Sequence, residues 1–448
     1  MRVSSAMPAS LAVPETVPAE LPPSRKAFAA WYAIFGGYAG LVAILSQYYH
    51  ERIWGDWATA GYLIAALAAW LWRSRGRDLA LAVSFAAAVA GPTAWLAAKA
   101  LPNSQITPDV FVVWRAASLL LSHGSPYFDT AQTAHQTAAI VYNPYLPFMA
   151  VFGLPHALGV TGLLGDTRFW TIATTLAMLA LAFRVAGRRD WFRAGFFLIA
   201  TPIAAFPLTV GITDPPVLGL FCLSLALLSR FRGNPRVVTA GLILGIGCAM
   251  KGTAWPALPI LAVMLAYRDG ARTAIRFTAS AVTTIGVLTL SFAPSLLVHP
   301  LALIANTIMF PLGLTRAQTP AASPLPGHLL ATHVPAGHVI ALLLLVASVL
   351  AVAASLLIWP PRDCTNATLR LVIALTLIFG FSPTTRFGYF TIPIGLLAWL
   401  VLTGWVTPWG WFDRLRGWLG FGGRTVSVAP ARAPAGPHEN IQRSAGAG

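Results

Sequence analysis

The chain has 448 residues, of which 57% are hydrophobic and 10% are charged, and its formal net charge is +16. Repeated apolar runs of roughly 20 residues are each long enough to cross a bilayer, so the composition excludes an ordinary soluble protein. The basic residues stand singly or in short clusters between these runs, without the continuous stripe that a nucleic-acid-binding surface needs. We predict an all-α polytopic membrane protein whose basic clusters set its topology.

The N-terminal residues 1–26 are polar and rich in Pro and Ala, and no small-residue cleavage site follows the first apolar run. This pattern favours a disordered cytoplasmic segment and an uncleaved first span. About twelve transmembrane helices are expected from the apolar runs 27–47, 57–72, 79–100, 168–186, 191–209, 214–230, 237–251, 253–268, 278–298, 338–359, 368–382 and 388–405.

A further apolar run, 145–163, is interrupted by Pro147, Gly153, Pro155 and Gly159. If it does not span and the N-terminus is cytoplasmic, most of the 30 Lys and Arg residues lie on the cytoplasmic side, as the positive-inside rule requires. A spanning 145–163 would place every later basic cluster on the wrong side. We therefore predict an interfacial or re-entrant helix here, two long outer loops at about 101–167 and 299–337, and both termini in the cytoplasm.

Acidic residues are scarce, with 14 in the whole chain, and Asp109 stands directly after a predicted span. It opens the amphipathic stretch PDVFVVWRAASLLLSHG, which is typical of a helix lying along the membrane surface. One interpretation is an N-capping Asp, because the dipole at a helix N-terminus favours a carboxylate. The other is a carboxylate with a chemical function.

The residues after this helix favour the second interpretation. A Gly-Ser-Pro-Tyr turn ends at Tyr127, and a Tyr-Asn-Pro-Tyr-Leu-Pro segment from Tyr142 leads into the broken apolar run. This order resembles the first outer loop of integral-membrane glycosyltransferases with the GT-C fold. It is most similar to the bacterial and actinobacterial polyprenol-phosphate-mannose-dependent α-mannosyltransferases of glycosyltransferase family 87. The resemblance implies that Asp109 is the catalytic base.

Three later segments resemble the same family. The turn Gly211–Asp214 loosely matches a G-Q-x-N turn, although the Gln is absent and an acid, Asp214, is present instead. Gly245–Lys251 resembles a G-x-x-x-x-x-K segment, and the segment 382–389 resembles a Ser-Pro turn. The resemblance covers residues 79–405, which implies a GT-C-like catalytic core. It leaves 27–78 as an N-terminal pair of helices and 406–448 as a basic cytoplasmic tail, largely disordered.

Isolated cations beside short outer turns are candidates for binding the donor phosphate. Lys251 and Arg386 have this position. Lys251 could instead snorkel to the membrane interface, and Arg386 could instead be solvated or bind lipid headgroups. The loop 299–337 is rich in Pro and Gly, and an apolar, irregular loop of this length usually folds back over a site. We expect a lid that brings Arg316 to the phosphate. The remaining candidates for substrate contact are Tyr127, Tyr142, Asp214, His328 and Tyr389.

The predicted activity is transfer of mannose from polyprenyl-phosphate-mannose to a lipid or glycan acceptor on the outer face of a bacterial plasma membrane. The resemblance implies inversion to an α linkage. We expect no cofactor and no metal site, because no DxD motif or carboxylate pair is present in the outer segments. An arabinofuranosyl or other polyprenyl-phosphate-sugar transferase is the alternative, and a secondary transporter is the rival from another class.

Overall fold

Each predicted apolar run contains helix in the computed structural model, which describes residues 25–72, 75–99, 106–133, 135–230 and 234–406. The predicted disordered N-terminal segment and basic tail lie outside these ranges, apart from residues 25, 26 and 406. The described part up to Trp405 forms one compact unit. It is helical, and the β-structure in these ranges is an isolated bridge between Ala322 and Thr385.

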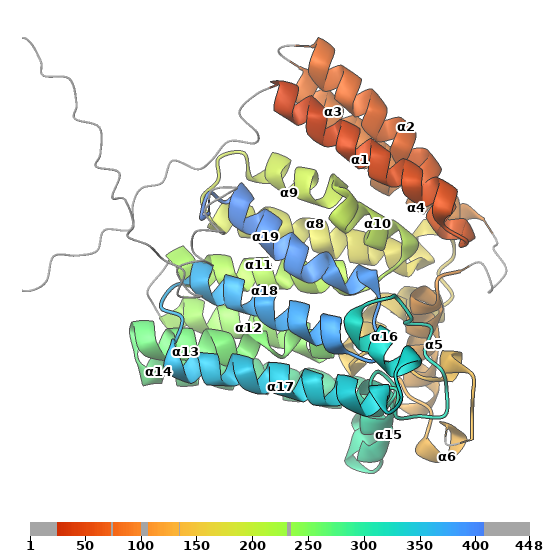
Figure 1. Cartoon of the computed structure of the whole chain (residues 1–448), viewed down its shortest axis with the longest axis vertical. Coiled ribbons are helices and arrows are strands. Elements are labelled where there is room, and N and C mark those ends of the chain that lie inside the picture. The colour runs from red at the N-terminus through yellow and green to blue at the C-terminus, as the bar shows by residue number, and fades with distance from the viewer. Residues whose placement is uncertain (1–24, 73–74, 100–105, 134, 231–233, 407–448) are drawn as a thin grey trace, which may run out of the picture. The chain divides into compact units, whose positions relative to one another are not determined.

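The first helices form a group of their own that shares a core with the middle of the chain (Figure 1). The phenol of Tyr62 donates a hydrogen bond to the carbonyl of Ala200 at 2.6 Å, and the indole of Trp54 donates to the carbonyl of Ala88 at 2.9 Å. The helices of this group are α1 (Arg25–Leu45), α2 (Tyr49–Leu71), α3 (Gly76–Phe85) and α4 (Gly91–Ala98), and they pack on α9 (Trp191–Ala200) and α10 (Pro202–Val210).

The remaining long helices lie side by side in a second group (Figure 1). They are α8 (Thr167–Val185), α11 (Asp214–Arg230), α12 (Asn234–Met250), α13 (Ala257–Asp269), α14 (Ala271–Phe292), α17 (Gly337–Ile358), α18 (Cys364–Phe381) and α19 (Thr391–Leu402). Small residues allow close packing: a Cβ at Gly241 or Gly245 of α12 would lie 2.5 or 2.7 Å from a carbonyl oxygen of α14. This is how a small-xxx-small face brings two membrane helices together.

The lengths of the helices and the exposure of their apolar side chains identify a multi-pass membrane protein. Among the described residues six helices are long and apolar enough to cross a bilayer, or seven if α9 and α10, bent by 65°, form one span. Leu343, Leu350 and Leu357 of α17 are 63%, 62% and 77% exposed, which suits lipid rather than water. The other five predicted spans contain shorter or more polar helices, namely α2, α11, α12, α13 and α19, so the number twelve stays a prediction.

The run 145–163 contains no α-helix of spanning length. It consists of a 3₁₀-helix (Pro147–Gly153), the single turn of α7 (Leu154–Ala157) and, after a glycine, the start of another 3₁₀-turn (Gly162–Gly165). Each piece is far shorter than the roughly 20 residues that a spanning helix needs. The structure therefore agrees with the expectation that this segment does not cross the membrane as a regular helix.

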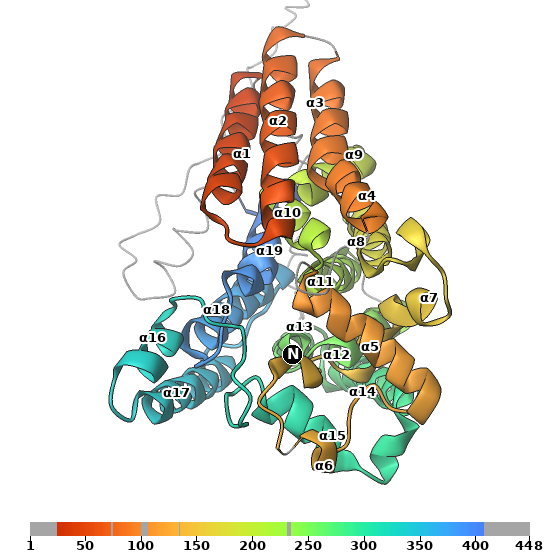
Figure 2. The ribbon, with the colours of Figure 1, turned by 90° about the vertical axis from the view of Figure 1, so that its right-hand side faces the viewer.

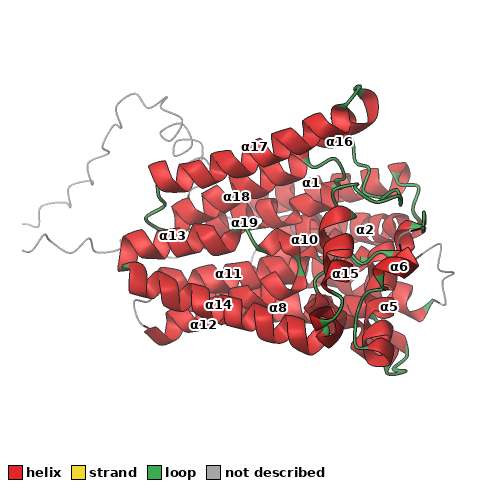
Figure 3. Cartoon of the chain, turned by 90° about the horizontal axis from the view of Figure 1, so that it is seen from below, coloured by secondary structure: helices red, strands yellow, loops and turns green. Residues whose placement is uncertain are grey.

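Both long loops carry short helices to the same end of the long ones (Figures 2 and 3). The first loop contributes α5 (Pro108–His123) and α6 (Thr130–Thr133), and the second contributes α15 (Pro300–Ile304) and α16 (Pro326–His333). Segments that are far apart in the sequence thereby meet around one cavity.

Candidate active site

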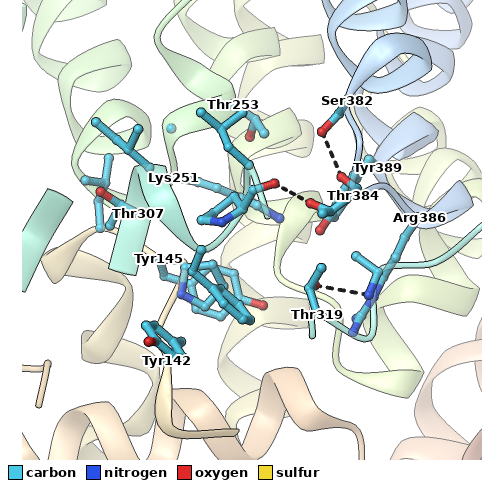
Figure 4. A pocket seen from close by; sticks show the side chains of 18 of the residues that line it. Tyr142, Tyr145, Lys251, Thr253, Thr307, Thr319, Ser382, Thr384, Arg386 and Tyr389 are labelled. Carbon is cyan, nitrogen blue, oxygen red and sulfur yellow. Dashed lines mark hydrogen bonds between the residues drawn. The ribbon is translucent and has the colours of Figure 1, made fainter. Parts of the chain in front are cut away.

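A cavity of about 640 Å³ lies where the two loops meet the ends of α12 and α18. Most of its wall is apolar, and the aliphatic residues in it include Val112, Leu303, Ile304, Ile308, Leu345, Leu375 and Ile378. The polar and aromatic side chains on its wall include Asp109, Tyr145, Lys251, Arg386 and Tyr389; the last four are labelled in Figure 4. The cavity thus combines a long apolar surface with a small charged region.

Asp109 places its carboxylate in this charged region. The N-cap of α5 is Thr107, whose hydroxyl donates to the carbonyl of Val210, and the side chain of Asp109 binds elsewhere. One carboxylate oxygen accepts a hydrogen bond from the phenol of Tyr145, and the other accepts from Nη1 of Arg386 at 2.9 Å. The interpretation of Asp109 as a helix cap is therefore wrong, and its carboxylate stands with two other polar groups on the cavity wall.

The two groups that contact Asp109, the guanidinium of Arg386 and the phenol of Tyr145, each stay in one protonation state. Burial alone lowers the pKa of Arg386, but the negative charge of Asp109 and the neighbouring tyrosines outweigh burial and raise it, so the guanidinium is permanently charged. Burial, followed by the charge of Asp109, raises the pKa of Tyr145 well above its ordinary value. The phenol therefore remains a hydrogen-bond donor at any physiological pH.

Two asparagines position Tyr145, and the sequence did not reveal their role. The side-chain oxygen of Asn143 accepts from the backbone N–H of Tyr145 at 3.1 Å, and its amide donates to the carbonyl of Pro126 at 3.2 Å. Its own backbone N–H donates to Oδ1 of Asn306 at 2.8 Å, which ties the first loop to the second. Asn143 and Asn306 are 2% and 0% exposed. The Asn-Pro pair at 143–144 was the available signal, since such pairs favour turns.

Lys251 and Asp214 form a second ion pair beside the first. Nζ of Lys251 lies 2.8 Å from Oδ2 of Asp214, and the two residues are 7% and 0% exposed. The ammonium also lies over the rings of Tyr145 and Tyr389, at 5.5 and 5.3 Å from their centroids. Lys251 lines the cavity whereas Asp214 does not, so the structure places Asp214 behind Lys251 and not on the cavity wall.

The second loop folds over the site as expected, but through other residues than those predicted. Its backbone pairs with the turn that carries Arg386: the N–H of Ser323 donates to the carbonyl of Thr385 at 2.9 Å, and the hydroxyl of Thr384 donates to the carbonyl of Pro311. Arg316 is exposed and does not line the cavity. His328 is half-buried, with Nδ1 3.0 Å from the carbonyl of Pro383, and is also absent from the cavity wall.

The tyrosines predicted to contact substrate have different positions. Tyr142 and Tyr389 line the cavity, and the ring of Tyr142 stacks on that of Phe310 at 4.7 Å between centroids. Tyr127 is buried beneath the wall, where its hydroxyl donates to the carbonyl of Tyr145 at 2.8 Å.

Within the described residues, no group of three or more His, Cys, Asp or Glu side chains could hold a metal ion.

No protein-family model matches the chain, and no curated protein matches it. Two solved structures are similar, and both are of ArnT from Cupriavidus metallidurans. The apo form has 18% identity and a TM-score of 0.41 over 70% of this chain and 58% of ArnT. The form bound to undecaprenyl phosphate has 15% identity and a TM-score of 0.46 over 78% and 64%. The chain thus spans less than two thirds of the length of these proteins.

Proposed function

We propose that the protein is an integral-membrane glycosyltransferase that transfers a sugar from a polyprenyl phosphate to a lipid or glycan acceptor. The observation that carries this proposal is the position of Asp109, Arg386 and Lys251 together in a cavity whose walls are mostly apolar. Aliphatic walls suit an isoprenoid chain, two cations suit its phosphate, and a carboxylate suits a reacting hydroxyl. The proposed sugar is mannose, as the sequence resemblance implies.

In the proposed reaction Asp109 takes the proton of the acceptor hydroxyl while that oxygen attacks the anomeric carbon. Each oxygen of Asp109 receives a hydrogen bond and still has a free lone pair for the incoming proton. The bond between the anomeric carbon and the phosphate oxygen breaks, and its electron pair leaves with the polyprenyl phosphate. Arg386 and Lys251 stabilise that developing charge. A single displacement inverts the anomeric centre, so a β-linked donor yields an α-linked product.

The orientation in the membrane is part of the proposal. α12 ends at Met250 beside the cavity, and α13 starts at Ala257 after the cavity-lining Pro256, so the far end of α13 with Arg268 lies away from the site. Arg184 likewise lies in the last turn of α8, whose first residue follows the first loop. Basic helix ends are preferentially cytoplasmic, which would put the cavity on the outer face of a bacterial plasma membrane, with both termini inside.

The test is transfer of radiolabelled sugar by the purified protein in nanodiscs. Polyprenyl-phosphate-mannose and polyprenyl-phosphate-arabinofuranose are each offered with a bacterial lipid extract, and labelled products are separated by chromatography. We expect transfer from the mannosyl donor. Transfer from the arabinofuranosyl donor alone would keep the reaction class and replace the sugar. Failure with every polyprenyl donor, together with solute uptake by proteoliposomes, would overturn the proposal in favour of a transporter.

A further inference from the structure

We infer that Asp214 is a positioning residue that acts through Lys251: from behind the cavity wall it keeps the ammonium group charged and aimed at the donor phosphate. The inference rests on the proposed function and deepens it. It departs from the sequence-based expectation, in which Asp214 would touch the substrate itself.

The geometry separates the roles of the two residues. Lys251 stands on the cavity wall, whereas Asp214 is fully buried and reaches Lys251 with Oδ2 at 2.8 Å. Its other oxygen, Oδ1, is buried and has no hydrogen-bond partner among the described residues. A carboxylate that is removed from solvent and bound only to one ammonium contributes its charge to that ammonium.

The turn before α11 holds Asp214 in this position. Gly211 has φ of +95°, and a Cβ there would lie 2.2 Å from Cγ2 of Val110. On its other side, a Cβ at Gly388 would lie 3.0 Å from Cδ1 of Ile212. The turn before Asp214 therefore packs against the start of α5, which carries Asp109, and against the segment that carries Arg386.

The charges around Lys251 explain why it needs a partner of its own. The groups that face it are the carboxylate of Asp214 and the rings of Tyr145 and Tyr389. The guanidinium of Arg386 belongs to the same region, but it is paired with Asp109. An ammonium that is taken out of water, next to a second cation and without a counter-ion, gives up its proton at a lower pH. Asp214 prevents this loss and so keeps two positive groups available to one phosphate.

The experiment measures binding of polyprenyl phosphate, and sugar transfer, as functions of pH between about 6 and about 9. In Asp214→Asn the amide can still accept a hydrogen bond from Lys251, but the negative charge is gone. Relative to wild type, we expect binding and transfer by this variant to fall progressively as the pH rises from about 6 to about 9, by at least about tenfold over that range. In Asp214→Asn/Lys251→Arg the dependence of binding and transfer on pH should disappear, because a guanidinium keeps its proton at these pH values. Asp214→Glu should restore the wild-type profile.

The matched control is Asp78→Asn, which removes a carboxylate from an exposed pair with Arg193 and should leave both profiles unchanged. A merely structural role for Asp214 would lower binding and transfer equally at every pH and would not be repaired by Lys251→Arg; that result overturns the inference. If Asp214→Asn does not fold, judged by gel filtration and thermal melting, the Glu variant and the double variant decide the question. Wild type that binds polyprenyl phosphate without transferring any sugar would contradict the proposed function and leave the binding test of the inference intact.

Discussion

Replacing Gly211 by alanine should damage both the fold and the site, because two separate costs fall on this one position. Its φ of +95° is a conformation that L-residues rarely adopt, and the new methyl group would lie 2.2 Å from Cγ2 of Val110. The left-handed backbone costs about 1 to 2 kcal/mol. Forcing an extra methyl group into a packed region costs about 1 to 3 kcal/mol. We expect Gly211→Ala to lose about 2 to 5 kcal/mol of stability.

The assay is thermal melting of the purified protein, combined with sugar transfer by the fraction that remains folded. Val110→Ala removes the atom that clashes, so in Gly211→Ala/Val110→Ala the two losses should be less than additive, by about 0.5 to 3 kcal/mol. The matched control is Gly286→Ala in α14, where a Cβ meets no atom within 4 Å and no loss is expected. If Gly211→Ala melts and transfers like wild type, the turn does not hold Asp214 in position as described.

Three further predictions concern the rest of the site. Asn143→Ala removes the acceptor for the N–H of Tyr145 and should cost about 1 to 3 kcal/mol in thermal or denaturant melts, with transfer reduced as well; unchanged melting would refute the role of this side chain. Burial and the charge of Asp109 raise the pKa of Tyr145, so the neutral phenol stabilises the folded protein. This contribution to the free energy of unfolding is fully present below the ordinary phenol pKa of 10 and falls as pH rises beyond it. Tyr145→Phe should therefore show a shallower alkaline decline of Tm than wild type, and an equal decline would contradict the assignment. Arg316→Gln should leave the KM for the donor unchanged, whereas Arg386→Gln should raise it; a raised KM in Arg316→Gln would show that the loop moves onto the site.

The helices were predictable because their signal is local. Apolar runs mark α17 and α18 within a few residues, and the prolines of 145–163 mark the absence of a continuous helix. The count of twelve spans was less secure because α13, with 13 residues, and α19, with 12, are each shorter than a typical span. Hydrophobicity in the sequence does not say how much of a short helix is buried against its neighbours.

The chemistry of the site was only partly predictable. Asp109, Lys251 and Arg386 could be selected because isolated charges are rare beside apolar runs. Their pairing could not, since Asp109 and Arg386 are 277 residues apart and the sequence gives no distance between loops. For the same reason Asp214 was expected to meet substrate, although it lies behind Lys251.

Arg316 and His328 show a different limit. Both were selected because they are polar residues in a loop that was expected to cover the site. The loop does cover the site, but it is held there by backbone pairing near Ser323 and Thr385. Backbone hydrogen bonds do not depend on the residue type, so the sequence does not reveal them. Asn143 and Asn306 illustrate the opposite case, in which buried amides organise the loop contacts and yet look like ordinary loop residues in the sequence.

The most direct test of the central claim compares Asp109→Asn with wild type in two measurements on the same preparation. The amide cannot take a proton from the acceptor hydroxyl, but it keeps the size of the carboxylate and can still accept a hydrogen bond from Tyr145 or Arg386. We predict that Asp109→Asn binds polyprenyl phosphate within a few-fold of wild type and loses sugar transfer by about 100-fold or more. Transfer by Asp109→Asn at the wild-type rate would show that this carboxylate is not the base and would contradict the account.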